Sequence, residues 1–185
     1  MGGVNGAEAL RALYALQEKD LEIDRLRKEA ESLPEELLSV RARVEALEAE
    51  LADLLERQAE LRKSYTRHSL DIEDLTAKEK QAEAEQRQAQ SAREQTQYEN
   101  RIQQIKDRIR ELLELSTPIM EAMEEVEAEI ARVEEALSGL RPRLEELLQE
   151  NAKRVEALEG EILKLQEERE AMAQGIPTPV LREYE

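Results

Sequence analysis

The stretch Ala77–Gln97 reads AKEKQAEAEQRQAQSAREQTQ and contains no large apolar residue. It lies between two long segments in which aliphatic residues recur every three or four positions. The midpoint of the 185 residues falls inside it, near Arg93. A polar centre between two heptad-patterned segments of similar length predicts the tip of an antiparallel helical hairpin.

The segment before this stretch follows an almost unbroken heptad pattern. Alternating steps of three and four residues keep one stripe on one helix face, and a strict period of about 3.5 residues makes that stripe supercoil around a partner. Large residues fill the stripe up to Leu75, and small or polar residues continue it toward the tip. The positions are Leu37, Val40, Val44, Leu47, Leu51, Leu54, Gln58, Leu61, Tyr65, His68, Ile72, Leu75, Glu79, Ala82, Gln86 and Ala89.

The segment after the stretch carries a second heptad series with one change of phase. An extra step of four after Asn151 shifts the stripe, which should locally unwind the supercoil. Pro118 has no backbone N–H, so we expect a kink or a new helix start there, and Gly139 with Pro142 marks a second weak point. The positions are Tyr98, Ile102, Ile105, Ile109, Leu112, Ser116, Ile119, Met123, Val126, Ile130, Val133, Leu137, Leu140, Leu144, Leu147, Asn151, Val155, Leu158, Ile162, Leu165, Arg169 and Met172.

A break is predicted before the first long series. Ser32 and Glu35 have the spacing of a capping box, and Pro34 would lie in the first turn of a new helix. We therefore expect a kink near Pro34. Before it, a helical segment with a less regular phase places these residues on roughly one face: Leu10, Leu13, Leu16, Ile23 and Leu26.

The predicted fold class is all-α: a long antiparallel coiled-coil hairpin, kinked near Pro34 and Pro118. Gly-rich residues 1–6 are expected to be disordered. The hairpin would comprise residues 7–174, with arm one at 7–90, the tip at about 88–97 and arm two at 98–174.

The exact turn and the end of arm two rest on local signals. Ser91 with Glu94, or Thr96 with Glu99, has capping-box spacing for the start of arm two. Gly175, Pro177 and Pro179 should end that arm. Residues 175–185 would then form a C-terminal tail, and Val180–Glu185 would begin a further short helix.

A parallel dimer of one continuous helix is the alternative fold. Such a dimer gives no reason for the polar centre or for two arms of similar length. Folding about the middle also brings Pro34 level with the phase change near Asn151–Val155, so that irregular positions meet. These features favour the hairpin, and both a monomer and a homodimer of hairpins remain open.

Composition excludes several functional classes. Lys+Arg 27 against Asp+Glu 44 gives a net charge of −17, which repels DNA and acidic membranes at long range. There is no cysteine and one histidine, so we expect neither a disulfide nor a Cys- or His-based metal cluster. No apolar run reaches the roughly 18 residues of a membrane span, and the first residues do not form a signal peptide. We expect a cytoplasmic protein without membrane contact.

We expect no enzymatic activity. His68, the single histidine, is interpreted as a residue of the seam, the heptad stripe along which the two arms pack. It would lie beside Tyr65 and face arm two near Pro118. Adjacent carboxylates such as Glu124 and Glu125 are interpreted as a solvated face, because a two-helix rod offers no catalytic pocket. No catalytic, cofactor-binding or metal-binding residue is therefore assigned, and no cofactor is expected in this chain.

The tip is the least acidic part of the chain and the place where a long hairpin would present contacts. Tyr98 would stack on a base or on a partner side chain. The alternative is an ordinary solvated helix end. The candidate tip contacts are Arg93, Glu94, Gln97, Tyr98, Asn100 and Arg101.

Four motifs along the chain resemble a known family. In order they are LQEKDLEIDRLRKEAESLPEEL, QYENRIQQIKDRI after the polar tip, PIMEAMEEVEAEI, and the terminal VLREYE. The chain resembles the bacterial coiled-coil proteins that carry a C-terminal four-cysteine zinc ribbon. Tyr98 matches the tyrosine of the family's Glu-Tyr tip pair, with Gln97 in place of the glutamate. Leu181, Tyr184 and Glu185 match the Leu-x-x-Tyr-Glu that precedes the ribbon.

The ribbon itself is absent from this sequence, so zinc is expected only if a ribbon follows Glu185. We expect either a shortened chain or a family member without the ribbon. The resemblance implies a non-enzymatic adaptor with protein and nucleic-acid partners, linked to transcription or RNA handling.

Three functions follow from these observations. The first is an adaptor or scaffold that presents its tip and shoulders to a protein partner. The second is a nucleic-acid-binding protein that uses the basic tip, with weak binding by this chain alone because of its net charge. The third is a factor that enters the secondary channel of RNA polymerase. The Gln- and Arg-rich tip argues against the third, because those factors carry acidic residues at the tip.

Overall fold

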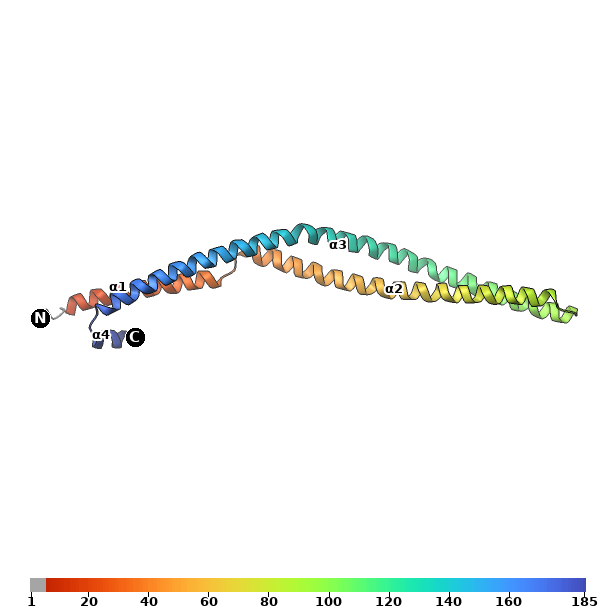
Figure 1. The fold of residues 1–185 in the computed structure, drawn as a ribbon, viewed down its shortest axis with the longest axis horizontal. Coiled ribbons are helices and arrows are strands. Elements are labelled where there is room, and N and C mark those ends of the chain that lie inside the picture. The colour runs from red at the N-terminus through yellow and green to blue at the C-terminus, as the bar shows by residue number, and fades with distance from the viewer. Residues whose placement is uncertain (1–5) are drawn as a thin grey trace. The chain divides into compact units, whose positions relative to one another are not determined.

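The computed structural model describes residues 6–185 and is helical almost throughout (Figure 1). The helices are α1 (Gly6–Glu31), α2 (Glu35–Arg87), α3 (Ala92–Gln174) and α4 (Thr178–Tyr184). Helix α3 runs antiparallel to α1 near the chain ends and antiparallel to α2 near the middle of the chain, which is the pairing of a helical hairpin. The prediction that residues 1–6 are disordered falls almost entirely outside the described residues, and Gly6 already belongs to α1.

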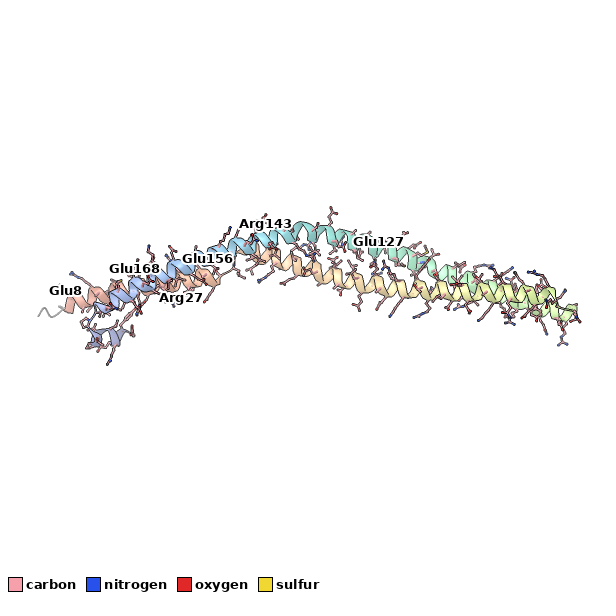
Figure 2. All side chains as sticks on the ribbon, viewed as in Figure 1. Glu8, Arg27, Glu127, Arg143, Glu156 and Glu168 are labelled. Atoms are coloured by element: carbon pink, nitrogen blue, oxygen red, sulfur yellow. The ribbon has the colours of Figure 1, made fainter. Side chains whose placement is uncertain are left out.

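The chain divides into two compact units, which we name by their place along the hairpin. The base unit comprises Met1–Arg43 with Leu140–Glu185, and the tip unit comprises Val44–Gly139. Charged side chains project outward along the helices of both units (Figure 2).

In the tip unit, α2 and the first half of α3 pack through their heptad stripes. Val44, Leu47, Leu54 and Ala82 of α2 are buried. Two ion pairs join the helices, Arg132 to Glu50 at 3.4 Å and Lys106 to Glu79 at 3.9 Å. Residue numbers fall on α3 as they rise on α2, so the pairing is antiparallel. The buried residues contributed by α3 are Ile102, Ile105, Leu112, Val126, Ile130, Val133 and Leu137.

The two predicted heptad series are confirmed by burial. Nearly every position in both series is buried or half-buried, including the positions after the phase change at Asn151. The exception is Tyr65, which is 36% exposed. A stripe recurring every three or four residues therefore located the seam, because that spacing returns side chains to one helix face.

Of the two alternatives predicted at Pro118, a kink or a new helix start, the new start does not occur, because α3 runs without interruption from Ala92 to Gln174. Proline removes one intrahelical hydrogen bond, but a long helix packed along its length tolerates that loss. The Ser116 hydroxyl donates to the Leu112 carbonyl at 2.8 Å, and the Thr117 hydroxyl donates to the Leu113 carbonyl at 3.2 Å. These two hydroxyls bind backbone in the turn before the proline. The helix also continues through Gly139 and Pro142.

The predicted break at Pro34 is confirmed, since α1 ends at Glu31 and α2 begins at Glu35. The predicted capping box is wrong. The Ser32 hydroxyl donates backward to the Glu29 carbonyl at 3.2 Å, so it closes α1 rather than opening α2. Pro34 lies just before α2, and its carbonyl accepts the first helical bond from the Leu38 N–H at 3.1 Å.

An arginine from the opposite arm completes the end of α1. Arg154 of α3 donates to the Glu29 carbonyl at 2.8 Å and to the Ser32 carbonyl at 2.7 Å. The same guanidinium group contacts the Asn151 side chain at 2.9 Å. The break near Pro34 is therefore level with the phase change at Asn151–Val155, as predicted.

The pairing register also changes across this break. Lys19 pairs with Glu168, whereas Glu36 pairs with Arg143, so α3 spans more residues than the broken arm over the same distance. Residues that are not helical rise about 3.3 Å each, against about 1.5 Å in a helix. The three nonhelical residues Ser32–Pro34 therefore account for part of this difference.

The base unit has its own small core. Ile23 and Leu26 of α1 form a buried cluster with Ile162 of α3, and Leu158 and Leu165 pack against it. Leu16 is fully buried on the same stripe.

The prediction for Leu10 is wrong, since this residue is 58% exposed and Ala9 is buried instead. The stripe of α1 runs through small and charged residues as well as leucines, and the irregular spacing of its leucines concealed its phase.

The second arm ends where Gly175 and Pro177 predicted. After Gln174, the Gly175 N–H donates to the Met172 carbonyl at 3.2 Å, and Ile176 is buried. The short helix α4 begins at Thr178, two residues before the predicted Val180. None of the helices in residues 6–185 carries an apolar stretch of the length and hydrophobicity that a bilayer crossing demands.

Candidate functional site

The hairpin turn lies at residues 88–91 and is closed by a serine cap. Ser91 accepts the Glu94 N–H through its side-chain oxygen at 3.2 Å, and the Glu94 carboxylate accepts the Gln90 N–H at 3.3 Å. Of the two predicted caps, Ser91 is the one that caps the N-terminus of α3. The Thr96 alternative is wrong, because Thr96 lies inside α3 and its hydroxyl donates to the Ala92 carbonyl at 2.9 Å.

The turn explains why no glycine marks it. Within residues 6–185, no residue adopts a positive φ angle, so the chain reverses through backbone conformations open to any residue. The Gln86 side chain of α2 donates to the Gln95 carbonyl of α3 at 3.3 Å across the turn. Together with the Ser91 cap, this bond fixes the start of α3.

The first turns of α3 form a shallow hollow of about 410 Å³. Glu94, Gln97, Tyr98 and Arg101 line it. The spacing of these residues, i, i+3, i+4 and i+7, places them on one helix face. Tyr98 is half-buried in the seam, whereas the other three side chains are exposed.

The structure therefore gathers four of the six candidate tip residues into one surface. Arg93 and Asn100 are exposed but do not line the hollow. Among the described residues, no ion pair or side-chain hydrogen bond engages Arg93, Gln97, Tyr98, Asn100 or Arg101. The side chains of Arg93, Gln97, Asn100 and Arg101 are exposed to solvent, and Tyr98 is half-buried.

The rest of the described chain offers little for catalysis. Residues 6–185 contain no group of three or more His, Asp or Glu side chains placed to hold a metal ion. His68 is half-buried in the seam, and its Nδ1 atom is buried without a hydrogen-bond partner in the described chain.

A polar network at the base unit was missed by sequence reasoning. Arg169 of α3 donates to Asp20 of α1 at 2.9 Å and to Glu185 at 3.1 Å. The Tyr184 hydroxyl of α4 donates to the other Asp20 oxygen at 2.6 Å. The signal that pointed to it was Arg169 itself, a charged residue at a seam position of the heptad.

The network alters the protonation of its members. The hydrogen bond to Asp20, with a further contribution from burial, raises the pKa of Tyr184 from 10.0 to about 12. Next to it, Lys19 donates to Glu168 at 2.7 Å. This bond raises the pKa of Lys19 and lowers that of Glu168. The Lys19–Glu168 pair joins α1 to α3, and the bonds of Tyr184 and Glu185 attach the C-terminal segment to Asp20 of α1 and Arg169 of α3.

Solved structures share this fold at low sequence identity. CT398 from Chlamydia trachomatis has a TM-score of 0.87 at 16% identity, covering 96% of this chain and 75% of that one. A protein from Mycobacterium smegmatis has a TM-score of 0.77 at 21% identity, covering 94% and 73%. HP0958 from Helicobacter pylori has a TM-score of 0.70 at 15% identity, covering 98% and 76%.

At these identities the likeness concerns the fold alone. No curated protein matches the chain in sequence. A family-level match does exist, and it covers residues 16–185, from the buried Leu16 of α1 to the end of the chain. The chain therefore belongs to the family of the CT398-like coiled coil hairpin domain.

Proposed function

We propose that this protein is a non-enzymatic scaffold that presents the tip of its hairpin to a protein partner. The observation that carries the proposal is the hollow formed by Glu94, Gln97, Tyr98 and Arg101 at the start of α3. It combines an aromatic ring with polar groups that have no partner within the described chain, except Glu94, which caps the turn.

The residue types suit a protein interface. Tyrosine and arginine are enriched among the residues that contribute most to protein–protein binding. The Tyr98 ring is half-buried, so it loses little conformational freedom when a partner covers it. The cap at Ser91 and the bond from Gln86 to Gln95 fix the backbone before any partner arrives.

The experiment compares proteins captured from a bacterial lysate by three forms of the chain. The tip variant is Tyr98→Ala with Arg101→Ala. The matched control is Tyr65→Ala with Arg62→Ala, which alters the same residue types in α2 of the same unit. We expect a partner that the wild type and the control capture and the tip variant does not.

Circular dichroism establishes that all three forms are equally helical. If the same proteins accompany all three, the tip does not bind a protein partner and the proposal fails.

Nucleic-acid binding is the second candidate, favoured by Tyr98 between Arg93 and Arg101. Aromatic stacking combined with positive charge is how proteins hold single strands. Anisotropy with a labelled single-stranded RNA should show binding at about 50 mM salt that weakens strongly by about 200 mM. Absence of binding at the lower salt concentration rules this candidate out for this chain.

The link to transcription or RNA handling, and zinc in a ribbon after Glu185, remain predictions from the resemblance. A reading frame that continues past Glu185 with two CxxC pairs is the observation that would support the zinc prediction.

A further inference from the structure

A second stripe of side chains runs along α3 in the tip unit, next to the seam. Its members alternate steps of four and three residues, the spacing that brings side chains onto one helix face. Each member directly follows a seam position, so the stripe is turned by about 100° from the seam around the helix axis. All of its side chains are exposed. We call it the flank stripe, and its residues are Lys106, Arg110, Leu113, Thr117, Met120, Glu124 and Glu127.

The flank stripe is complementary in charge to its own reverse. It begins with two cations, Lys106 and Arg110, and it ends with two anions, Glu124 and Glu127. The three residues between these pairs are uncharged. A second copy of the stripe that runs antiparallel to the first would therefore bring anions opposite cations at both ends. It would also bring the uncharged residues of the two copies together in the middle.

The middle of the flank stripe is suited to burial. Leu113 is 53% exposed and Met120 is 49% exposed, so covering them would remove apolar surface from water. The Thr117 hydroxyl between them already donates to the Leu113 carbonyl at 3.2 Å. Because this donor has its partner within α3, a second chain could cover the middle without leaving the hydroxyl unsatisfied.

The charged ends of the flank stripe are at most weakly engaged within the chain. Lys106 lies 3.9 Å from Glu79, and Arg110 lies 3.9 Å from Asp107, both long distances for a charge-assisted hydrogen bond. The two cationic side chains remain 50% and 67% exposed. Among the described residues, no ion pair or side-chain hydrogen bond engages the two glutamates at the other end, and both are exposed. Both ends are therefore open to ion pairs with another chain.

We propose that the flank stripe is the interface of a homodimer, in which the α3 helices of two copies pack antiparallel about a two-fold axis at Thr117. A contact that uses the same surface on both copies closes on itself and stops at the dimer. The residues that face each other lie equally far from Thr117 in sequence, to within one residue. The facing pairs, one member from each copy, are Lys106 with Glu127, Arg110 with Glu124, and Leu113 with Met120.

This dimer should be weak. The flank stripe is about 32 Å long, and only its middle is apolar. We expect a dissociation constant in the micromolar range, so that the chain is a monomer below about 1 μM. The stripe begins after the tip hollow, which ends at Arg101, and the dimer does not depend on the function proposed for the tip.

Charge reversal tests the proposed pairing. The acidic variant is Lys106→Glu with Arg110→Glu, and the basic variant is Glu124→Lys with Glu127→Lys. Sedimentation at about 100 μM chain should show a dimer for the wild type. Each variant alone should dissociate at least ten-fold more readily, because like charges then face each other at both ends.

An equal mixture of the two variants should form the dimer again, because every facing pair then joins an anion to a cation. Each variant changes the net charge of −17 by four, so both stay acidic and overall attraction between them cannot produce this result. If the mixture stays monomeric, the stripes do not face each other in this register, and the proposal is wrong.

The apolar middle is tested by Leu113→Gln with Met120→Gln, which should weaken the dimer ten-fold or more. The matched control is Lys63→Glu with Arg67→Glu. It changes the same residue types at the same spacing as the acidic variant, on exposed positions of α2 in the same unit. The control should dimerise as the wild type does, and circular dichroism establishes that all forms are equally helical.

Three results would overturn the proposal. The first is a wild type that stays monomeric at about 100 μM. The second is a dimer that the flank-stripe variants leave intact, since another surface would then hold it. The third is an equal loss in the control, which would show general charge repulsion between acidic chains rather than a specific interface.

Discussion

Arg154 shows how one side chain in α3 completes a helix in the opposite arm. The last carbonyls of any helix lack intrahelical partners. The Glu29 carbonyl in the last turn of α1 and the Ser32 carbonyl just after the helix accept hydrogen bonds from the Arg154 guanidinium. A guanidinium group offers five donors, which suits it to bind several carbonyls at once.

Replacing this arginine should destabilise the base unit. Arg154→Met keeps an unbranched apolar stem but removes the donors, and we expect a loss of about 1–3 kcal/mol in the free energy of unfolding. Urea denaturation followed by circular dichroism measures it. The control is Arg132→Met, whose exposed ion pair with Glu50 should contribute less than about 1 kcal/mol. Equal losses in the two variants would contradict the capping role.

Tyr184 gives a prediction on pH. Its pKa rises from 10.0 to about 12, so the folded state favours the protonated phenol. The stability from this bond is fully present below about pH 10 and is lost as the pH rises through about 12. Ultraviolet titration of the phenols, taken as wild type minus Tyr184→Phe, should show this late ionisation. Asp20→Asn should lower the pKa of Tyr184, and an ordinary value in the wild type would contradict the hydrogen bond.

At the scale of elements, α3 forms one arm of the hairpin as a single uninterrupted helix. It runs opposite α1 in the base unit and opposite α2 in the tip unit, whereas the other arm is broken at Ser32–Pro34. Long helices draw most of their stability from tertiary packing of an apolar stripe rather than from intrinsic propensity. The stripe of α3 is buried or half-buried on both sides of Pro118, and this explains why the proline does not end the helix.

Removing that proline should therefore stabilise the protein. Pro118→Ala restores the N–H that the Glu114 carbonyl lacks and removes the clash of the ring, a gain of up to about 3 kcal/mol. Thermal unfolding should show a higher Tm. Met120→Ala, an exposed substitution in the same turn, should change stability by less than about 0.5 kcal/mol. A lower Tm for Pro118→Ala would mean that the proline has a structural role that the helix requires.

At the scale of the whole molecule, the chain doubles back on itself rather than pairing in parallel with a second copy. The ion pairs of the tip unit join residues far apart in sequence, such as Glu50 and Arg132. The Ser91 cap provides the reversal that such pairing needs. The parallel dimer of one continuous helix is thus excluded for the folded chain.

Spin labels test the antiparallel pairing in solution. The chain has no cysteine, so Asp53→Cys and Glu129→Cys, both exposed and level with the Glu50–Arg132 pair, label it at two chosen sites. Helices in contact lie about 8–10 Å apart, so a short distance between the labels is expected. It should persist after dilution with unlabelled protein. A short distance that disappears on dilution would mean that the contact is between molecules.

The sequence predicted the elements better than the contacts of the candidate site. The heptad positions were right almost throughout because they depend on spacing along one chain. The capping boxes were less certain, since Ser32, Ser91 and Thr96 all have suitable spacing and, of the three, Ser91 alone caps the N-terminus of a helix. Spacing alone does not reveal which hydroxyl faces a free N–H.

By itself, the sequence determined two long seams, a polar tip and a break near Pro34, because helix periodicity and proline act locally. Only the tertiary structure decided which distant polar groups meet. Asp20 binds Arg169, which is 149 positions away in sequence, and Tyr184, which is 164 positions away. Arg154 binds the carbonyls of Glu29 and Ser32, which are 125 and 122 positions away. These contacts depend on the register of α3 against α1, which follows from the length of the nonhelical break and is set only when the two arms pack.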